Sequence, residues 1–227
     1  MDEQVIAAMA RWPDVPAVYG WLSLTESGHW RLHPQGDALH HPDALGETIS
    51  SAQILAFINR NYAADALGQW YFQNGPQRVY VRLDAAPFIA RTIGDTAGEP
   101  GLRTHTGRDI LQVNALYLDD TGRLYLATEH GAALVAGRDL PALADALQVA
   151  AQHGNPQADL HASLARCLET GKAVQLPTPG LRGFSAMTVL HYSHRHTLEA
   201  ALQFRRLPHL PDQPTPSTSQ ESGKHAC

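Results

Sequence analysis

The apolar positions of this chain change period after its first few residues. Residues 3 to 12 place apolar side chains on one helical face, and Pro13 and Pro16 end that pattern. From residue 17 onward the apolar positions follow the period of strands, in short runs separated by turn residues. We therefore expect a short leading helix followed by β-hairpins.

One turn pattern occurs three times. A residue able to accept a local backbone hydrogen bond stands three positions before a glycine, and a polar residue, a large apolar residue, any residue and a second apolar residue follow. Hairpin corners with a left-handed glycine have this composition. The copies begin at Thr25, Asp65 and Asp119 and continue as Gly28-His29-Trp30-Arg31-Leu32, Gly68-Gln69-Trp70-Tyr71-Phe72 and Gly122-Arg123-Leu124-Tyr125-Leu126.

The remaining pattern predicts helices between groups of strands. Helices are expected over 51–61 with Ser50 or Ser51 as N-cap, 140–152 after Asp139, 159–169 ending at Gly171, and 198–207. Strands are expected over 69–73, 78–83, 110–118, 123–128, 132–135 and 184–192. This indicates an α+β fold with two sequential related halves of short antiparallel strands plus helix, a helical extension and a disordered tail. The expected ranges are 1–93, a connection at 94–108, 109–153, 154–207 and 208–227.

Composition argues against several classes of protein. The 227 residues carry a formal net charge of −5 and a pI of about 6.2, without a dense run of Lys or Arg, so a nucleic-acid surface is not expected. No apolar run reaches about 18 residues, the length that a membrane-spanning helix needs. The acidic start and the two cysteines, Cys167 and Cys227, fit neither a signal peptide nor a disulfide framework. We expect a cytoplasmic protein.

The block from Ile58-Asn59-Arg60-Asn61-Tyr62 through Gly68-Gln69-Trp70-Tyr71-Phe72-Gln73-Asn74-Gly75-Pro76-Gln77-Arg78-Val79-Tyr80-Val81 resembles a proteobacterial family of uncharacterised proteins, a domain of unknown function, over about residues 14 to 145. More remotely, Gly28-His29-Trp30 and Arg82-Leu83-Asp84-Ala85-Ala86-Pro87-Phe88 are similar in order to another uncharacterised bacterial family. That second resemblance implies repeated strand and helix motifs and a suggested role in signal transduction. Neither family supplies an accepted site.

A cluster of amide and guanidinium groups is the first candidate for ligand binding. Arg78 and Arg82 lie on one face of a predicted strand, where they are positioned to clamp a carboxylate or phosphate. The competing interpretation is that the amides serve turns and caps, while the arginines form a wet sheet face. The candidate ligand-binding residues are Asn61, Gln73, Asn74, Arg78 and Arg82.

Histidines give a second candidate, His191, His194 and His196, with Glu199 or His209 as further metal ligands. No single regular element presents all three imidazoles on one face, so a solvated histidine-rich segment is the competing interpretation. His40 and His41 beside Asp43 are interpreted as surface residues, and Cys167 as an inert buried thiol. The bulky aromatic residues beside the glycine corners, Trp21 included, are interpreted as core anchors.

The first functional hypothesis is a non-catalytic binding or regulatory module, in which the groove between the halves or the Arg78 and Arg82 face takes a small anionic ligand or a protein partner. The alternative is a metal-dependent or acid/base enzyme that uses the three histidines. A purely structural interaction protein is a third interpretation. No cofactor and no catalytic residue is expected, and the oligomeric state stays open.

Overall fold

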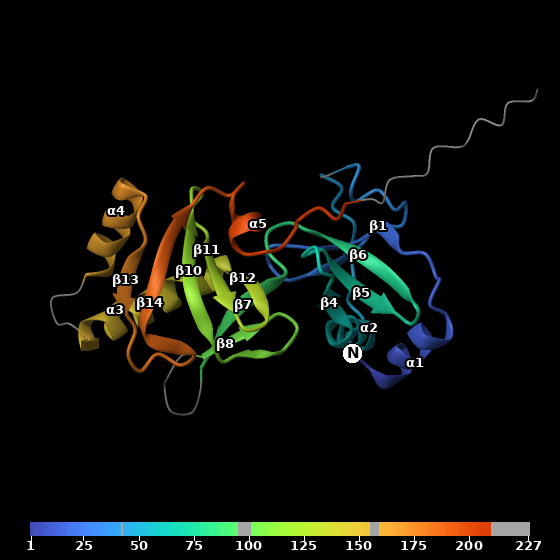
Figure 1. Ribbon diagram of the computed structural model, residues 1–227, viewed down its shortest axis with the longest axis horizontal. Coiled ribbons are helices and arrows are strands. Elements are labelled where there is room, and N and C mark those ends of the chain that lie inside the picture. Colours follow the sequence, from blue (N-terminus) through green and yellow to red (C-terminus); the bar gives the residue numbers. More distant parts are fainter. Residues whose placement is uncertain (42, 95–100, 155–158, 210–227) are drawn as a thin grey trace, which may run out of the picture.

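The computed structural model describes residues 1–41, 43–94, 101–154 and 159–209, and its fold is mixed α+β with two sheets (Figure 1). Among these residues are five α-helices and one short 3₁₀ helix. Figure 1 shows the two sheets side by side along the long axis of the molecule. We call the first sheet with its helices the N-terminal unit, and the second sheet with its helices the C-terminal unit.

The N-terminal unit has six strands in the order β3-β2-β1-β6-β5-β4. β1 and β6 run parallel at its centre, and all other neighbours are antiparallel. Ser51, one of the two predicted N-caps, caps α2 by accepting a hydrogen bond from the backbone of Ile54. The elements are α1 (Glu3–Arg11), β1 (Val18–Leu24), β2 (Trp30–Leu32), β3 (Glu47–Thr48), α2 (Ala52–Arg60), β4 (Tyr62–Ala64), β5 (Trp70–Asn74) and β6 (Gln77–Leu83).

The C-terminal unit has eight strands in the order β13-β14-β10-β11-β12-β7-β8-β9. The helices α3 and α4 contact the edge strand β13. The elements are β7 (Phe88–Ile93), β8 (Gly101–Thr104), β9 (Asp109–Ile110), β10 (Val113–Asp119), β11 (Leu124–Thr128), β12 (Gly131–Val135), η1 (Gly137–Asp139), α3 (Leu140–Gly154), α4 (Leu160–Thr170), β13 (Val174–Pro177), β14 (Phe184–Ser193) and α5 (Leu198–Ala201).

Six strands of each sheet follow the same topology. The five pairings among β1 to β6 recur, in the same relative direction, among the strands numbered six higher, including the parallel pairs β1–β6 and β7–β12, and β10 additionally pairs with β14. The connection between β3 and β4 holds α2, whereas β9 and β10 are joined by residues 111–112 alone. The C-terminal unit is therefore covered by helices that follow its six strands.

The three predicted glycine corners are confirmed, and a fourth one occurs in the β8–β9 hairpin. In each corner the glycine N–H donates to the carbonyl three residues earlier, and the glycine φ lies between +75° and +89°. The sequence pattern missed the fourth corner because Asp109, not a large apolar residue, comes two positions after its glycine. The corners are Thr25–Gly28, Asp65–Gly68, Thr104–Gly107 and Asp119–Gly122.

Several expectations need correction. The connection predicted over 94–108 contains β8, because glycine and threonine suit tight hairpins as well as loops. The strand expected over 184–192 is confirmed as β14, but the segment predicted as a helical extension also contributes β13 to the second sheet, and the helix expected over 198–207 ends at Ala201. The expected tail, 208–227, lies beyond the described residues from position 210 onward.

Aromatic side chains join the two units in one hydrophobic core. Phe88 at the start of β7 lies 4.9 Å from Trp70 and 5.8 Å from Tyr62, measured between ring centroids. The Tyr62 hydroxyl donates a hydrogen bond to the carbonyl of Pro87 at 3.1 Å. Trp30 is buried in the same core, but Trp21 is 43% exposed, so its assignment as a core anchor is wrong.

Residues 198–209, which we call the C-terminal strap, pass from the C-terminal unit back to the N-terminal unit (Figure 1). The backbone N–H of Arg205 donates to the Gly68 carbonyl, and the Leu83 N–H donates to the Arg206 carbonyl. Phe204, between these contacts, is buried. Among the described residues no helix combines the length and the apolar character that a bilayer crossing requires.

Candidate functional site

The candidate amides of the N-terminal unit serve local structure. Asn61 is fully buried, and its side chain bonds the backbone N–H and the carboxylate of Asp2, which fixes the start of α1. Gln73 is also buried and donates to the Gly75 carbonyl across the β5–β6 turn. Asn74 lies exposed at that turn. These contacts agree with the interpretation of the amides as turn and cap residues.

Arg78 and Arg82 share a strand face but have different surroundings. The Arg82 side chain is only 7% exposed and donates to the carbonyls of Ala38 and Ala44 in the loop after β2. Arg78 instead stacks over Tyr71, with its guanidinium carbon 4.7 Å from the ring centroid. Arg82 thus holds a loop in place, and the two guanidinium groups do not converge on one pocket.

The three candidate histidines are not brought together. His191 lies on β14 and stacks on Tyr117 at 4.6 Å, whereas His194 and His196 stack on each other beyond the end of that strand. Across residues 1–41, 43–94, 101–154 and 159–209, no group of three His, Cys, Asp or Glu side chains is arranged to hold a metal ion. The three imidazoles of the alternative metal site therefore do not come together there, because the end of β14 separates His191 from the other two.

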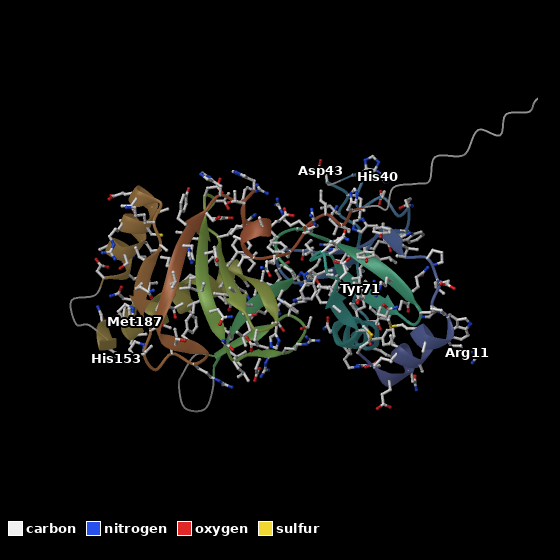
Figure 2. All side chains as sticks on the ribbon, viewed as in Figure 1. Arg11, His40, Asp43, Tyr71, His153 and Met187 are labelled. Carbon is white, nitrogen blue, oxygen red and sulfur yellow. The ribbon has the colours of Figure 1, made fainter. Side chains whose placement is uncertain are left out.

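The other chemical candidates agree with their sequence interpretation. Cys167 is buried against β14, its Sγ lies 3.7 Å from the Leu190 carbonyl, and burial raises the pKa of its thiol. His40 and Asp43 lie at the outer edge of their loop, as Figure 2 shows. These two residues, like His41, are exposed.

A cleft of about 490 Å³ lies where the two units meet, and we call it the arginine cleft. Two glycine corners form its walls, the β1–β2 corner from the N-terminal unit and the β10–β11 corner from the C-terminal unit. The end of β12 and the turn that begins α3 complete it. Its lining residues are Glu26, Ser27, His29, Arg91, Gly122, Arg123, Leu124, Leu134, Val135, Ala136, Gly137, Arg138 and Leu140.

Three separate elements supply the arginines of this cleft. Arg91, on β7, donates from Nη2 to the Ser27 carbonyl at 2.8 Å, and its Nε is buried with no acceptor within the described structure. Arg123, after the β10–β11 corner, pairs with Glu26 at 2.6 Å and so connects the corners of the two units. Arg138, in η1, has a side chain that is 73% exposed.

The charge of the cleft is positive. Its lining contains three guanidinium groups, and Glu26 is the one acid among the lining residues that the structure describes, while Arg138 also pairs with Asp139, next to the lining, at 3.5 Å. The turn Gly137–Asp139 leads directly into α3, where the Leu140 N–H donates to the Gly137 carbonyl and Pro141 has no N–H. The dipole of α3 places partial positive charge at this end of the helix, which adds to the attraction for anions. The apolar residues Leu124, Leu134 and Leu140 form the rest of the wall.

A histidine ring packs beside this junction. His105, in the β8–β9 corner, accepts a hydrogen bond at Nδ1 from the Ile89 N–H at 3.2 Å, and its ring lies 5.6 Å from Trp30. Its Nε2 is buried with no partner in the described part of the chain. Burial and, secondly, the positive charge of Arg91 lower the pKa of His105 to about 3. The imidazole is therefore neutral at pH 7.

The sequence predicted a groove between the two halves but not the arginines that line it. Arg123 entered the expected pattern only as the polar residue of a glycine corner, and Arg91 and Arg138 were in no candidate site. The segment from Val135 to Leu140 carries a signal, since a strand followed by glycine, polar residues and a helix places a helix N-terminus at a strand end. The pairing of β7 with β12 then brings Arg91 to the same place.

Comparison with known proteins identifies the family. The DUF2944 family model, described as "Protein of unknown function (DUF2946)", matches residues 1–205. The chain belongs to this family. Its members form a domain of unknown function, as the resemblance of the segment 58–81 implied. No curated protein matches the chain.

Two crystal structures of DUF1285 family proteins are similar to the chain. The protein from Silicibacter pomeroyi DSS-3 has 17% identity and a TM-score of 0.41, over 64% of this chain and 84% of that one. The protein from Shewanella baltica OS155 has 14% identity and a TM-score of 0.40, over 56% of this chain and 91% of that one. These values are too low to carry an argument about function.

Proposed function

We propose that this protein is a non-catalytic binding module that takes a small anion in the arginine cleft. The observation that carries the proposal is the convergence of Arg91, Arg123 and Arg138 from three elements on one cleft, against a single lining acid, Glu26. The groove between the two units was one of the two places where the sequence predicted an anion. The other, the face of Arg78 and Arg82, has less support because Arg82 already bonds backbone carbonyls.

Guanidinium groups suit this role because they stay charged and present several N–H donors in one plane. Hydrogen bonds from arginine to carboxylate or phosphate are charge-assisted and commonly bidentate. A cleft of about 490 Å³ falls within the usual size of small-molecule sites. The ligand class that fits is a compact phosphate or carboxylate with a short apolar portion facing Leu124 and Leu140.

We further propose a regulatory role for this binding, because the cleft is shared between the two units. The ion pair of Arg123 with Glu26 connects their corners, and an anion that binds Arg123 competes with Glu26 for the same guanidinium. Binding would in this way change the contact between the units. The matching order of six strands in each sheet supports a duplication as the origin of this arrangement.

The test is thermal unfolding in the presence of phosphate, pyrophosphate, sulfate and citrate. A ligand present at 100 times its Kd stabilises the folded state by about 2.7 kcal/mol. We expect at least one of these anions to raise the Tm, and the double variant Arg91→Gln, Arg138→Gln to bind it at least tenfold more weakly. The matched control is Arg108→Gln, since Arg108 is an exposed arginine of the same unit outside the cleft.

Three outcomes contradict the proposal. They are an unchanged Tm with all four anions, equal loss of binding in the control variant, and turnover of p-nitrophenyl phosphate by the purified protein. The turnover assay is included because Ser27 Oγ lies 2.9 Å from His29 Nδ1 inside the cleft. Hydrolysis that is lost in Ser27→Ala would replace the non-catalytic proposal by an enzymatic one.

A further inference from the structure

A second pocket lies entirely within the N-terminal unit and differs from the arginine cleft in its chemistry. It is a groove of about 480 Å³ between α2 and the strands β1, β2, β5 and β6, and we call it the apolar groove. Nine of its eleven lining residues are apolar. The other two, Asn74 and Gln77, face each other in the register of the β5–β6 hairpin.

The floor and the walls of the groove are held by packing. Ile58 and Phe72 are buried, and the Phe72 ring meets Phe57 edge to face at 5.5 Å. Trp21 lies over the turn at Gly36, where an added Cβ would come within 3.1 Å of the indole Nε1. Glycine at this position, with φ +65°, thus lets the indole lie against the backbone as a wall of the groove.

Three large apolar side chains of the groove stay exposed to water. Trp21 is 43%, Leu32 40% and Ile54 50% exposed. With roughly 200 Å² for each side chain, they leave only about 270 Å² of apolar surface uncovered. A stable interface between two copies of the chain buries about 800 Å² on each partner. The groove is therefore small for a protein interface, but its volume suits a small molecule.

The lining also determines the charge of the occupant. No acidic, basic or histidine side chain belongs to the described lining, so a charged ligand would lose its hydration without gaining a counter-charge. The amides of Asn74 and Gln77 both donate and accept hydrogen bonds, and Gln77 is held in place through its Nε2 by the Pro16 carbonyl at 3.3 Å. One uncharged polar group of a ligand can therefore be satisfied at that end.

From these observations we infer that the apolar groove is a binding site for a neutral, mainly apolar small molecule with one uncharged hydrogen-bonding group. The molecule lies against Trp21, Leu32 and Ile54 and directs its polar group toward Asn74 and Gln77. This site is independent of the arginine cleft, because no residue lines both pockets.

The test is a fluorescence titration with N-phenyl-1-naphthylamine, a neutral aromatic amine, as the probe. We expect saturable binding of one probe per chain, with a Kd at least tenfold higher in Ile54→Glu, which places a carboxylate at the groove. The control is Leu168→Glu, because Leu168 is also a helical apolar residue and is 47% exposed, but lies on α4. Circular dichroism and the Tm verify that both variants fold, and 10 mM phosphate should leave probe binding unchanged.

Absence of saturable probe binding, or equal weakening by both variants, overturns the inference. So does a dimer in sedimentation analysis that Ile54→Glu alone dissociates, since the groove would then be an interface between copies. If Ile54→Glu fails to fold, Leu32→Glu, at the opposite wall, is the second variant. Because phosphate and the naphthylamine report different pockets, failure of one site leaves the other one standing.

Discussion

Gly68→Ala is the substitution that examines most directly how the C-terminal strap joins the two units. Gly68 has φ +75°, and a Cβ at this position would lie 2.6 Å from the carbonyl oxygen of Gln203 and 3.1 Å from the Cα of Phe204. Both are backbone atoms of the strap, so no side-chain rotation relieves the contact. Gly122, at the corresponding corner of the other unit, has φ +81°, and no atom lies within 4 Å of the position that an alanine Cβ would occupy there.

The two corners allow the effect of the strap to be separated from that of the backbone conformation. Alanine in the left-handed region costs roughly 1–2 kcal/mol, and this applies equally to Gly122→Ala. Gly68→Ala also displaces the strap, which removes the hydrogen bond from the Arg205 N–H to the Gly68 carbonyl, worth about 1 kcal/mol. Partial exposure of Phe204, now only 4% exposed, adds about 1–3 kcal/mol, a part of what full burial of a phenylalanine contributes. We expect Gly68→Ala to lose about 2–4 kcal/mol more than Gly122→Ala.

The assay is urea unfolding at equilibrium, with the free energy of unfolding taken from the midpoint and the slope. Limited trypsin digestion provides a second measurement, because a displaced strap exposes the bonds after Arg205 and Arg206. Equal losses of stability in the two variants, with equal rates of cleavage in the strap, would refute the reasoning. They would mean that the strap contributes nothing to the folded state beyond the cost of the corner itself.

Two further predictions concern His105 and Arg82. Because the folded pKa of His105, about 3, lies below its unfolded value of 6.5, its stabilising contribution is complete above pH 6.5 and falls as the pH drops toward 3. Between pH 6.5 and 5 the free energy of unfolding should therefore fall by about 2 kcal/mol more than in His105→Asn, which keeps an acceptor for the Ile89 N–H. Parallel pH profiles of the two proteins would contradict this. Arg82→Gln should lower the free energy of unfolding by about 2–4 kcal/mol because it leaves buried loop carbonyls without a charged donor. Arg78→Gln should lower it by only about 0.5–1 kcal/mol, because only the stacking on Tyr71 is lost. Similar losses in both variants would disprove the difference in their roles.

Local chemistry explains which elements the sequence predicted well. The corners at Gly28, Gly68 and Gly122 were found because hydrogen bonding and a positive φ within five residues require particular side chains. The N-cap of α2 at Ser51 and the C-cap of α4 at Gly171 follow from the same kind of local bond. Buried strands such as β11 were also visible, because apolar alternation reflects the two faces of a strand.

The wrong predictions from the sequence share a different cause. Trp21 resembles Trp30 in sequence but is exposed, because the pairing of β1 with β6 is irregular between Val18 and Leu22. Arg82 was expected in solvent, but the loop after β2 folds over it. In both cases the decisive contact joins residues that are distant in the chain, and no local pattern records it.

The sequence by itself determined the hairpin corners, the helix caps, the mixed α+β class and the family, because each depends on short-range bonds or on residues in order. Only the tertiary structure decided that Arg91, Arg123 and Arg138 converge, that His191 lies apart from His194 and His196, and that the strap closes on Gly68. The physical reason is that strand pairing and core packing position these residues through long-range contacts, whose partners are chosen by the whole chain.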